Sequence, residues 1–325
     1  MNRRNLLLAA LTGAAGISSS PARAQAVPVK MGFRLDWRPG AQHAPFYLGK
    51  ARGYYATEGI DLIIISGSGS ADAVKQLGAR AIDLALVDAL VLVQAAEQEV
   101  PVRSIGAYYQ RTPVVLMSPR AKPVTDVKQL LQGVRLGVKK GSATYQGLLA
   151  LLAANGITPE QVTLADIGFG VQPMLLGQVD AMMGFAMNEP LEAEDAGMSV
   201  AQMPASEKGV HAYGLTLASN NTVLAAHADA VAGFLRATRR AVRETIAEPD
   251  KAVRALAAAV PEIGVVRETK VLAATVPYWA AAEGATEPCG QTESGWGQTI
   301  ATAKALGLVD TPPKASTVYV TGLAT

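Results

Sequence analysis

Residues 35–62 read LDWRPGAQHAPFYLGKARGYYATEGIDL, a stretch whose strand, turn and helix predict the fold. Residues 30–35 alternate as a strand does, Pro39-Gly40 ends the alternation, and residues 44–55 have a helical period. A second strand begins at Ile60. In open α/β sheets such a strand-to-helix turn lies outside the carboxyl ends of the strands, where ligands bind. We therefore expect three side chains of this turn at a binding site: Asp36, Trp37 and His43.

Short apolar strands alternate with helices along the rest of the chain, which predicts mostly parallel sheets. The first group of expected strands covers residues 29–35, 61–65, 84–87, 102–108 and 114–118. After Pro119 the pattern starts again, with helices over residues 124–132 and 144–155 and strands at residues 135–138 and near Thr163 and Ala181. Two α/β lobes are the expected result.

Two segments, LGARAIDL at residues 77–84 and LGQVDA at residues 176–181, each end a helix at glycine and start a strand from aspartate. The strands that follow end in Val87-Asp88-Ala89 and Met187-Asn188-Glu189-Pro190. Polar side chains therefore stand at a strand's carboxyl end in each lobe, which predicts a ligand cleft between the lobes.

A strand over residues 214–219 returns to the first lobe and can pair with residues 114–118 as a two-stranded hinge. We assign residues 27–116 and 220–325 to lobe 1 and residues 117–219 to lobe 2. Amphipathic helices over residues 226–246, 251–260, 268–281 and 296–306 are expected to pack on lobe 1.

Residues 1–26 have the pattern of a cleaved signal peptide, so we expect export to the periplasm. A basic start precedes a short apolar region and small residues at 22–26. Arg3-Arg4 also fits twin-arginine export, and the ordinary secretory route stays open. Cleavage removes three arginines and no acid, which changes the formal net charge from +2 to −1. Without a basic stripe, nucleic acid is not an expected partner.

The residues needed for metal, disulfide or hydrolytic chemistry are sparse. Cys289 is the single cysteine, and the three histidines lack metal-ligand spacing. No Gly-x-Ser-x-Gly motif is present. We therefore expect no metal, no cofactor and no catalytic residue.

Short motifs are spread over nearly the whole mature chain. They are Asp36-Trp37, His43, Tyr47-Leu48, Gly53-Tyr54-Tyr55, Gly59-Ile60-Asp61, Asp83, Gly137-Val138, Gly141-Ser142, Gly177-Gln178-Val179-Asp180-Ala181, Asn188-Glu189-Pro190 and Gly214-Leu215-Thr216-Leu217. Together they resemble the NMT1/THI5-like solute-binding proteins of ABC importers, in particular the branch that binds thiamine precursors and is related to the yeast pyrimidine synthase.

This resemblance implies a periplasmic binding protein-like type II fold, with two α/β lobes joined by a two-strand hinge. It implies closure on a small molecule and delivery to an ABC permease in the inner membrane, and we expect a monomer. The related enzyme branch carries a Schiff-base lysine and a histidine at positions that we place at Val87 and Val91. Without an amine at that position, the covalent chemistry of the synthase is not expected.

Aromatic residues make up 5% of the chain, yet several fall at expected strand ends or first helical turns beside the cleft. Such rings can stack on a flat ligand. The candidates are Trp37, Tyr47, Tyr108, Tyr145 and Phe185, with Tyr109 beside them. For Tyr47, Tyr109 and Phe185, a place in the core is the alternative.

Carboxylates from both lobes supply acceptors for the N–H groups of an aminopyrimidine. They are Asp36, Asp88 and Glu189, and Glu189 with Asn188 is the main candidate for reading the edge of the ring. Two alternatives stay open: Asp88 can cap the following helix, and His43 can cap its own helix instead of contacting ligand.

Glycine and serine turns at residues 66–70 and 141–142 each precede an expected helix. They offer N–H and hydroxyl groups, which makes Ser66, Ser68 and Ser142 candidate ligand contacts. An ordinary N-capped loop has the same composition.

The leading hypothesis is a periplasmic solute-binding protein that holds a thiamine-precursor pyrimidine or a similar flat heterocycle between its lobes. One alternative keeps the fold but binds a sulfonate, nitrate or other small anion through the two glycine-serine helix starts. A pyrimidine synthase, a secreted hydrolase and a ligand sensor are further alternatives.

Overall fold

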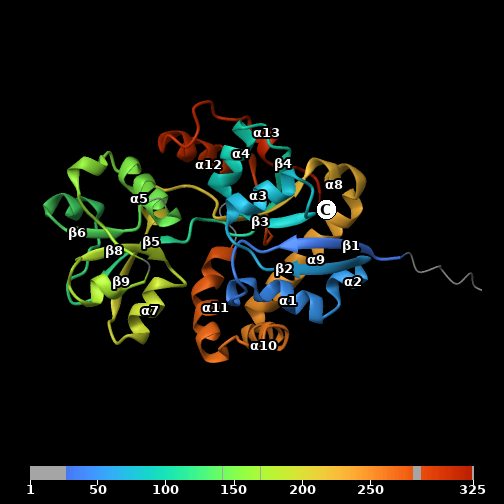
Figure 1. Ribbon diagram of the computed structural model, residues 1–325, viewed down its shortest axis with the longest axis horizontal. Coiled ribbons are helices and arrows are strands. Elements are labelled where there is room, and N and C mark those ends of the chain that lie inside the picture. The colour runs from blue at the N-terminus through green and yellow to red at the C-terminus, as the bar shows by residue number, and fades with distance from the viewer. Residues whose placement is uncertain (1–26, 141, 169, 281–286, 324–325) are drawn as a thin grey trace, which may run out of the picture.

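The computed structural model describes residues 27–140, 142–168, 170–280 and 287–323, which form two α/β lobes (Figure 1). The predicted signal peptide, residues 1–26, lies outside the described residues. Within the described residues, none of the helices has the length and apolar character needed to cross a membrane.

Each lobe contains one five-stranded sheet, and the two sheets have the same arrangement. The first has the order β2-β1-β3-β10-β4, from β1 (Val29–Arg34), β2 (Ile60–Ile65), β3 (Leu84–Asp88), β4 (Val102–Ala107) and β10 (Leu215–Asn220). The second has the order β7-β6-β8-β5-β9, from β5 (Val114–Pro119), β6 (Arg135–Val138), β7 (Thr163–Asp166), β8 (Ala181–Phe185) and β9 (Val200–Pro204). In each sheet the fourth strand runs against the others, so both are mostly parallel, as predicted.

The helices lie between the strands and, after β10, cover the first lobe. They are α1 (Ala44–Ala51), α2 (Tyr54–Thr57), α3 (Ser70–Gly78), α4 (Ala89–Glu97), α5 (Ala143–Ala154), α6 (Gln172–Leu175), α7 (Glu189–Asp195), α8 (Asn221–Ala226), α9 (Ala228–Ala247), α10 (Pro249–Ala259), α11 (Val265–Trp279), α12 (Glu293–Ala305) and α13 (Ala315–Val318). Short 3-10 helices are η1 (Ala41–His43), η2 (Val127–Gln132), η3 (Pro159–Gln161) and η4 (Ala205–Lys208).

Two expected helices differ from those observed. The helix expected over residues 44–55 is divided into α1 and α2, because Gly53 has a left-handed backbone with φ of +71°. The helix expected over residues 124–132 is the shorter η2, whose start is set by Asp126. The Asp126 carboxylate accepts the Lys128 N–H at 2.8 Å, so the helix begins after that residue.

The two repeated glycine-aspartate segments perform the same structural task in the two lobes. Asp83 Oδ2 accepts the Gly32 N–H of β1 at 2.8 Å. Asp180 Oδ2 accepts the Arg135 N–H of β6 at 3.0 Å. Asp83 therefore ties the start of β3 to β1, and Asp180 ties the start of β8 to β6, so the repeat reflects a common architecture.

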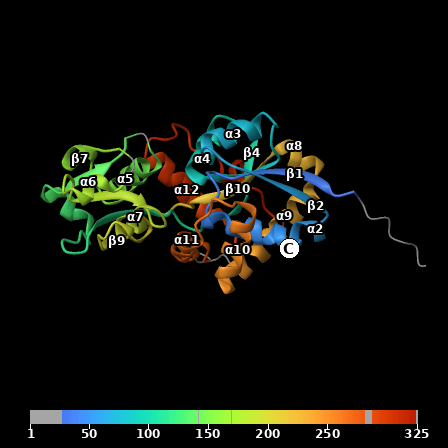
Figure 2. The same ribbon diagram turned by 60° about the horizontal axis from the view of Figure 1, so that its bottom comes forward.

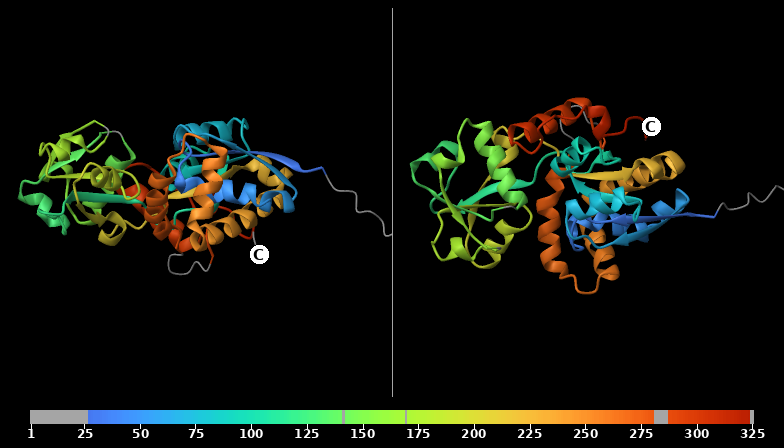
Figure 3. Two further views of the ribbon diagram at one scale, coloured as in Figure 1. Left: turned by 90° about the horizontal axis from the view of Figure 1, so that it is seen from below. Right: turned by 45° about the horizontal axis from the view of Figure 1, so that its top comes forward.

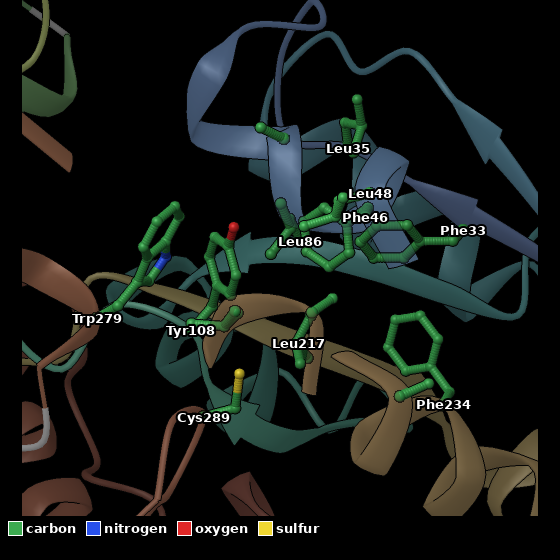
Figure 4. Packing of buried hydrophobic residues seen from close by; sticks show 14 of the residues in the cluster. Phe33, Leu35, Phe46, Leu48, Leu86, Tyr108, Leu217, Phe234, Trp279 and Cys289 are labelled. Carbon is green, nitrogen blue, oxygen red and sulfur yellow. The ribbon is translucent and has the colours of Figure 1, made fainter. Parts of the chain in front are cut away.

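The core of lobe 1 is rich in aromatic rings (Figure 4). Phe33 of β1 lies 4.5 Å from Phe46 of α1 and 5.2 Å from Phe234 of α9, measured between ring centroids. Trp279 of α11 packs edge-on against Tyr108. Helices α9 to α11 therefore bury their apolar faces against the core of the first lobe, as predicted.

The predicted pairing of residues 114–118 with residues 214–219 is not observed. Strand β5 pairs with β8 and β9, whereas β10 pairs with β3 and β4. The two crossing segments instead meet one step closer to lobe 1, where the Tyr109 N–H donates to Leu215 O at 2.8 Å and the Gly214 N–H donates to Tyr109 O at 3.1 Å. A Cβ atom at Gly214 would lie 2.9 Å from Arg111 O, so glycine permits this close crossing.

Further contacts join the lobes away from the crossing segments. Helix α12 packs against both α4 and α5 (Figure 2). Helix α11 stands on the side of lobe 1 that faces lobe 2 (Figure 3). Its Lys270 Nζ lies 2.8 Å from Asp195 Oδ1 at the end of α7, and Arg267 pairs with the other oxygen of Asp195. The described arrangement of the lobes is therefore tied by ion pairs as well as by the backbone.

Candidate functional site

A cavity of about 430 Å³ lies between the lobes, at the carboxyl ends of β3 and β8. Pockets of roughly 300–1,000 Å³ are typical of sites that enclose an organic ligand. Seven predicted site residues line it: Asp36, Trp37, Asp88, Ser142, Phe185, Asn188 and Glu189. Six others do not: His43, Tyr47, Ser66, Ser68, Tyr108 and Tyr145.

The Asp36 carboxylate is held in the cavity wall by a histidine behind it. His43 Nε2 lies 2.8 Å from Asp36 Oδ1, and His43 itself is 0% exposed. The Gly40 N–H donates to His43 Nδ1 at 3.2 Å. His43 therefore does not line the cavity, and its side chain does not cap α1. Its Nδ1 instead accepts the N–H of Gly40, the N-cap residue of η1, so the capping alternative holds for η1, the 3-10 helix that contains His43.

The glycine-serine loop between β2 and α3 packs against the turn that carries Trp37. The Gly67 N–H donates to Trp37 O at 2.9 Å, and the Gly69 N–H donates to Asp36 O at 2.8 Å. A Cβ atom at Gly67 would lie only 1.9 Å from Leu35 O, so glycine is needed for this approach. The loop thus fixes the backbone of the Asp36-Trp37 turn.

The serines predicted in this loop do not line the cavity, but the next one does. Ser66 and Ser68 are exposed, and the Ser68 hydroxyl is shared between Arg34 and Asp72. Ser70, at the start of α3, lines the cavity, and its Oγ accepts the Asp88 N–H at 2.9 Å.

Asp88 both caps a helix and lines the cavity. Its Oδ1 accepts the Leu90 N–H at 2.9 Å and the Val91 N–H at 3.4 Å, so the alternative reading of Asp88 as the cap of α4 is confirmed. Burial raises the pKa of Asp88 to about 6, although these two backbone bonds act in the opposite direction. The negative charge of Asp36 raises it further.

Glu189 is the first residue of α7 and lines the cavity from lobe 2. Its Oε2 accepts the Phe185 N–H at 2.7 Å, which anchors one carboxylate oxygen. Burial raises the pKa of Glu189, and the Phe185 N–H partly opposes this effect. A Cβ atom at Gly184 would lie 2.8 Å from Glu189 Cβ, so the glycine leaves room for the carboxylate side chain.

The aromatic lining differs in part from that expected. Trp37 is 55% exposed and lies at the cavity, as do Phe185 and the buried Tyr109. Tyr108 is instead fully buried in the core of lobe 1, and its hydroxyl donates to Gln42 O at 2.7 Å. Tyr47 packs partly against the same core, and Tyr145 packs against the core of lobe 2. Stacking of a ligand on Tyr47 or Tyr145 is therefore not supported by this geometry.

Several cavity residues were not among the predicted ones. They include Met182, Met183 and Met187 from the end of β8 and the residues after it, with Gln42, Lys139 and Thr144. Three of the nine methionines of the chain fall within six residues of each other around Phe185, and that clustering is the signal that identifies them. Methionine gives an adaptable, polarisable wall that favours contact with aromatic rings.

The charge of the cavity is predominantly acidic. Three carboxylates, Asp36, Asp88 and Glu189, line it together with the single lysine Lys139 among the described lining residues. Of the two glycine-serine helix starts expected to hold an anion, the first lies beside Asp36 and Asp88, whereas Ser142 of the second lies near Lys139. Gly141 lies outside the described residues. No group of three histidine, cysteine or acidic residues suited to a metal occurs in the described parts of the chain.

Comparison with known proteins places this chain in a family. Residues 40–252 match the family model described as NMT1/THI5 like. The chain belongs to the NMT1/THI5-like family. Membership accounts for the two-lobed fold and confirms the family resemblance inferred from the sequence, although Asp36 and Trp37 precede the matched residues.

Proteins similar in sequence to this chain include both binding proteins and enzymes. A riboflavin-binding protein, RibY, from Chloroflexus aurantiacus is 27% identical over 93% of this chain and 88% of its own length. A formylaminopyrimidine-binding protein from Halalkalibacterium halodurans is 28% identical over 68% of each chain. A 4-amino-5-hydroxymethyl-2-methylpyrimidine phosphate synthase, THI5, from Saccharomyces cerevisiae is 24% identical over 69% of each chain.

The fold is also that of solved periplasmic binding proteins. The aliphatic sulphonate binding protein SsuA from Escherichia coli aligns with a TM-score of 0.70 and 13% identity, over 91% of this chain and 94% of that one. At this identity the likeness concerns the architecture alone. It confirms the predicted α/β fold with two lobes.

Proposed function

We propose that this protein is the solute-binding component of an ABC importer and that it holds a flat nitrogen heterocycle in the interlobe cavity. The candidate ligands are a thiamine-precursor pyrimidine or a similar ring system such as a flavin. The observation that carries this proposal is the pairing of aromatic and methionine walls with carboxylates that come from both lobes.

The walls suit the faces of a planar ring. Trp37 and Tyr109 lie on the lobe 1 side, and Phe185 with its neighbouring methionines lies on the lobe 2 side. A ring placed between them gains stacking and sulfur-aromatic contacts on both faces. Because the two sides belong to different lobes, ligand binding favours the arrangement in which the lobes are close together.

The carboxylates suit the edges of such a ring. Glu189 has one oxygen anchored by the Phe185 N–H, which leaves its second oxygen, Oε1, to accept from an amino group. Asp36 supplies a second acceptor from the opposite lobe. Hydrogen bonds to charged groups contribute about 1.5–3 kcal/mol each, so the two lobes would share the recognition of one ligand.

The cavity fits a heterocycle better than a small anion. A water molecule occupies about 30 Å³ in the liquid, so a cavity of about 430 Å³ greatly exceeds the size of nitrate or a sulfonate group. Three carboxylates would also repel an anion, and Lys139 offsets one of them. Both observations disfavour the anion-binding alternative.

Titration calorimetry tests the proposal with formylaminopyrimidine, riboflavin, methanesulfonate and nitrate as titrants. We expect a heterocycle to bind and the anions not to bind. Glu189→Gln should weaken heterocycle binding by about tenfold, because a charge-assisted acceptor is lost. Glu192→Gln in the same helix, outside the cavity lining, is the matched control. Tight binding of an anion that is indifferent to Glu189→Gln would overturn the proposal.

We further propose that the protein binds its ligand without converting it. In the synthase branch a lysine is expected at the position of Val87, which is 0% exposed in β3. Lys139 remains as a lysine in the described cavity lining. Incubation with pyridoxal phosphate and borohydride, followed by peptide mapping, should leave no stoichiometric adduct on Lys139. A stoichiometric adduct would favour the synthase alternative.

The proposed setting is the periplasm, where the protein would act as a monomer and deliver its ligand to an inner-membrane permease. The pattern of residues 1–26 supports export. N-terminal sequencing of the exported chain should find a start between residues 25 and 27, and retention of residues 1–26 would contradict export by cleavage.

A further inference from the structure

His43 is fully buried, yet it reaches the cavity through one contact. It is 0% exposed and is not among the lining residues, whereas Asp36, its hydrogen-bond partner, lines the cavity. A buried polar ring is costly unless its nitrogens are paired, and both nitrogens of His43 have a partner. The His43 ring therefore contacts Asp36 inside the protein and is too deeply buried to contact a ligand directly.

The two partners of His43 determine its tautomer. The backbone N–H of Gly40 can only donate, and it points to Nδ1 at 3.2 Å. Nδ1 is therefore the unprotonated acceptor, and the proton of the neutral ring is on Nε2. Nε2 lies 2.8 Å from Asp36 Oδ1, so the Nε2–H group donates a hydrogen bond to the Asp36 carboxylate.

This donation has a consequence for the second oxygen of Asp36. The backbone carbonyl of Asp36 is already fixed by the Gly69 N–H at 2.8 Å, so both the main chain and one carboxylate oxygen are restrained. The carboxylate plane is then defined by the ring.

We propose that His43 is a positioning residue that orients Asp36, so that Oδ1 is held by the ring and Oδ2 accepts an N–H from the bound heterocycle. The inference rests on the proposed function of the cavity. In this arrangement Asp36 contacts the ligand and His43 lies behind Asp36. The geometry predicts that Asp36 recognises the ligand poorly when the hydrogen bond from Nε2–H is lost.

A matched pair of substitutions separates positioning from folding. The amide nitrogen of His43→Gln can take the place of Nε2 and donate to Asp36, at the loss of the Gly40 bond. The amide oxygen of His43→Asn can take the place of Nδ1 and accept from Gly40, but the shorter side chain does not reach Asp36. Each variant therefore loses one buried hydrogen bond, and we expect similar decreases in Tm.

Titration calorimetry with formylaminopyrimidine and riboflavin should then distinguish the two variants. For whichever compound the wild-type protein binds, we expect His43→Asn to weaken binding about tenfold and His43→Gln to stay within about threefold. Equal losses in both variants, or wild-type affinity in His43→Asn, would refute the positioning role alone. No binding of either compound by the wild-type protein would instead refute the proposed function on which it rests.

A second measurement needs no ligand. The chain contains three histidines, so nitrogen NMR of protein labelled at histidine gives few signals, and the His43 signals are those absent from His43→Asn. We expect the neutral ring with its proton on Nε2. A proton on Nδ1 would overturn the inference whatever the ligand is.

Discussion

Asp88 allows a quantitative test, because its carboxylate lines the candidate cavity and its burial costs stability. Its pKa is raised from the ordinary 3.8 to about 6 in the folded protein. The folded state therefore binds a proton more tightly than the unfolded chain does, and the free energy of unfolding should fall as the pH rises from about 4 to about 6. Each pKa unit corresponds to about 1.4 kcal/mol, so above pH 6 the penalty reaches about 3 kcal/mol.

The substitution Asp88→Asn removes this penalty while keeping the cap of α4. The asparagine oxygen can still accept the Leu90 and Val91 N–H groups, and asparagine is as good an N-cap as aspartate. At pH 7 we expect the variant to be more stable than wild type by up to about 3 kcal/mol. The difference should vanish near pH 3 and below, where the carboxyl is largely protonated in both states.

Urea denaturation at several pH values between 3 and 8 provides the assay. Glu189, whose pKa is also raised, is present in both proteins and does not contribute to their difference. Asp126→Asn is the matched control, because Asp126 is an exposed cap of η2, and we expect no gain there. The reasoning is refuted if Asp88→Asn is no more stable than wild type at pH 7, or if the difference does not change with pH.

Three other perturbations address the cavity walls and the contact between lobes. Gly67→Ala should lower stability and abolish heterocycle binding. The alanine Cβ would lie 1.9 Å from Leu35 O and would force the loop away from the Trp37 turn. Thermal melting measures the loss of stability, and calorimetry measures the loss of binding. Trp37→Ala should weaken heterocycle binding at least tenfold by calorimetry, with a change of less than about 0.5 kcal/mol in unfolding free energy, because this side chain is 55% exposed. Asp195→Asn should weaken binding about threefold at low salt and have no effect at high salt, because it removes exposed ion pairs between α7 and α11; calorimetry at two ionic strengths tests this.

Each of these perturbations has a control within the same chain. Gly168 lines the cavity, but a Cβ there meets nothing within 4 Å, so Gly168→Ala should leave the fold intact. Trp37→Phe should keep most of the binding if stacking is the interaction that matters. Glu58→Gln breaks an ion pair with Arg236 inside lobe 1 and should not change affinity. Equal effects of test and control would contradict the corresponding prediction.

Much of the fold can be predicted from patterns in the amino-acid sequence alone. The alternation of strands and helices, and the glycines and aspartates at their boundaries, predicted both lobes and the cleft between them. The sequence pattern does not predict how strands pair at the hinge. Strands β5 and β10 are both apolar, and pairing with each other or with strands of their own lobes would satisfy their hydrogen bonds. The division of α1 from α2 depended on the left-handed backbone of Gly53, and a helical period does not report it.

The errors at the site are mostly errors of one or two positions. Tyr109, and not Tyr108, lines the cavity, because the ring of Tyr108 lies behind that of Tyr109, at 5.2 Å between ring centroids, and packs on Phe46 in the core of lobe 1. Thr144 similarly lines the cavity in place of Tyr145, and Ser70 in place of Ser68. The sequence thus predicts which segments lie at the cavity. Which side chain of a segment points into the cavity depends on strand register and helix rotation, and packing elsewhere in the fold sets both.

The predicted carboxylates line the cavity because they follow buried strands closely. Asp88 ends β3, and Glu189 follows β8 after a short turn, so their positions are fixed by the same strand ends that form the cleft. His43 does not line the cavity, for a reason that the sequence does not show. Its type suggested a ligand contact, but only the fold shows that its ring is enclosed and bonded to Asp36.

Native mass spectrometry of the protein as purified tests the central claim most directly, because a cavity that closes between two lobes can retain its ligand. We expect an added mass whose released compound has the ultraviolet absorbance of a conjugated nitrogen heterocycle, and we expect Glu189→Gln to carry less of it. A retained sulfonate or nitrate, or a heterocycle retained equally by wild type and Glu189→Gln, would contradict recognition of a flat ring by the cavity carboxylates.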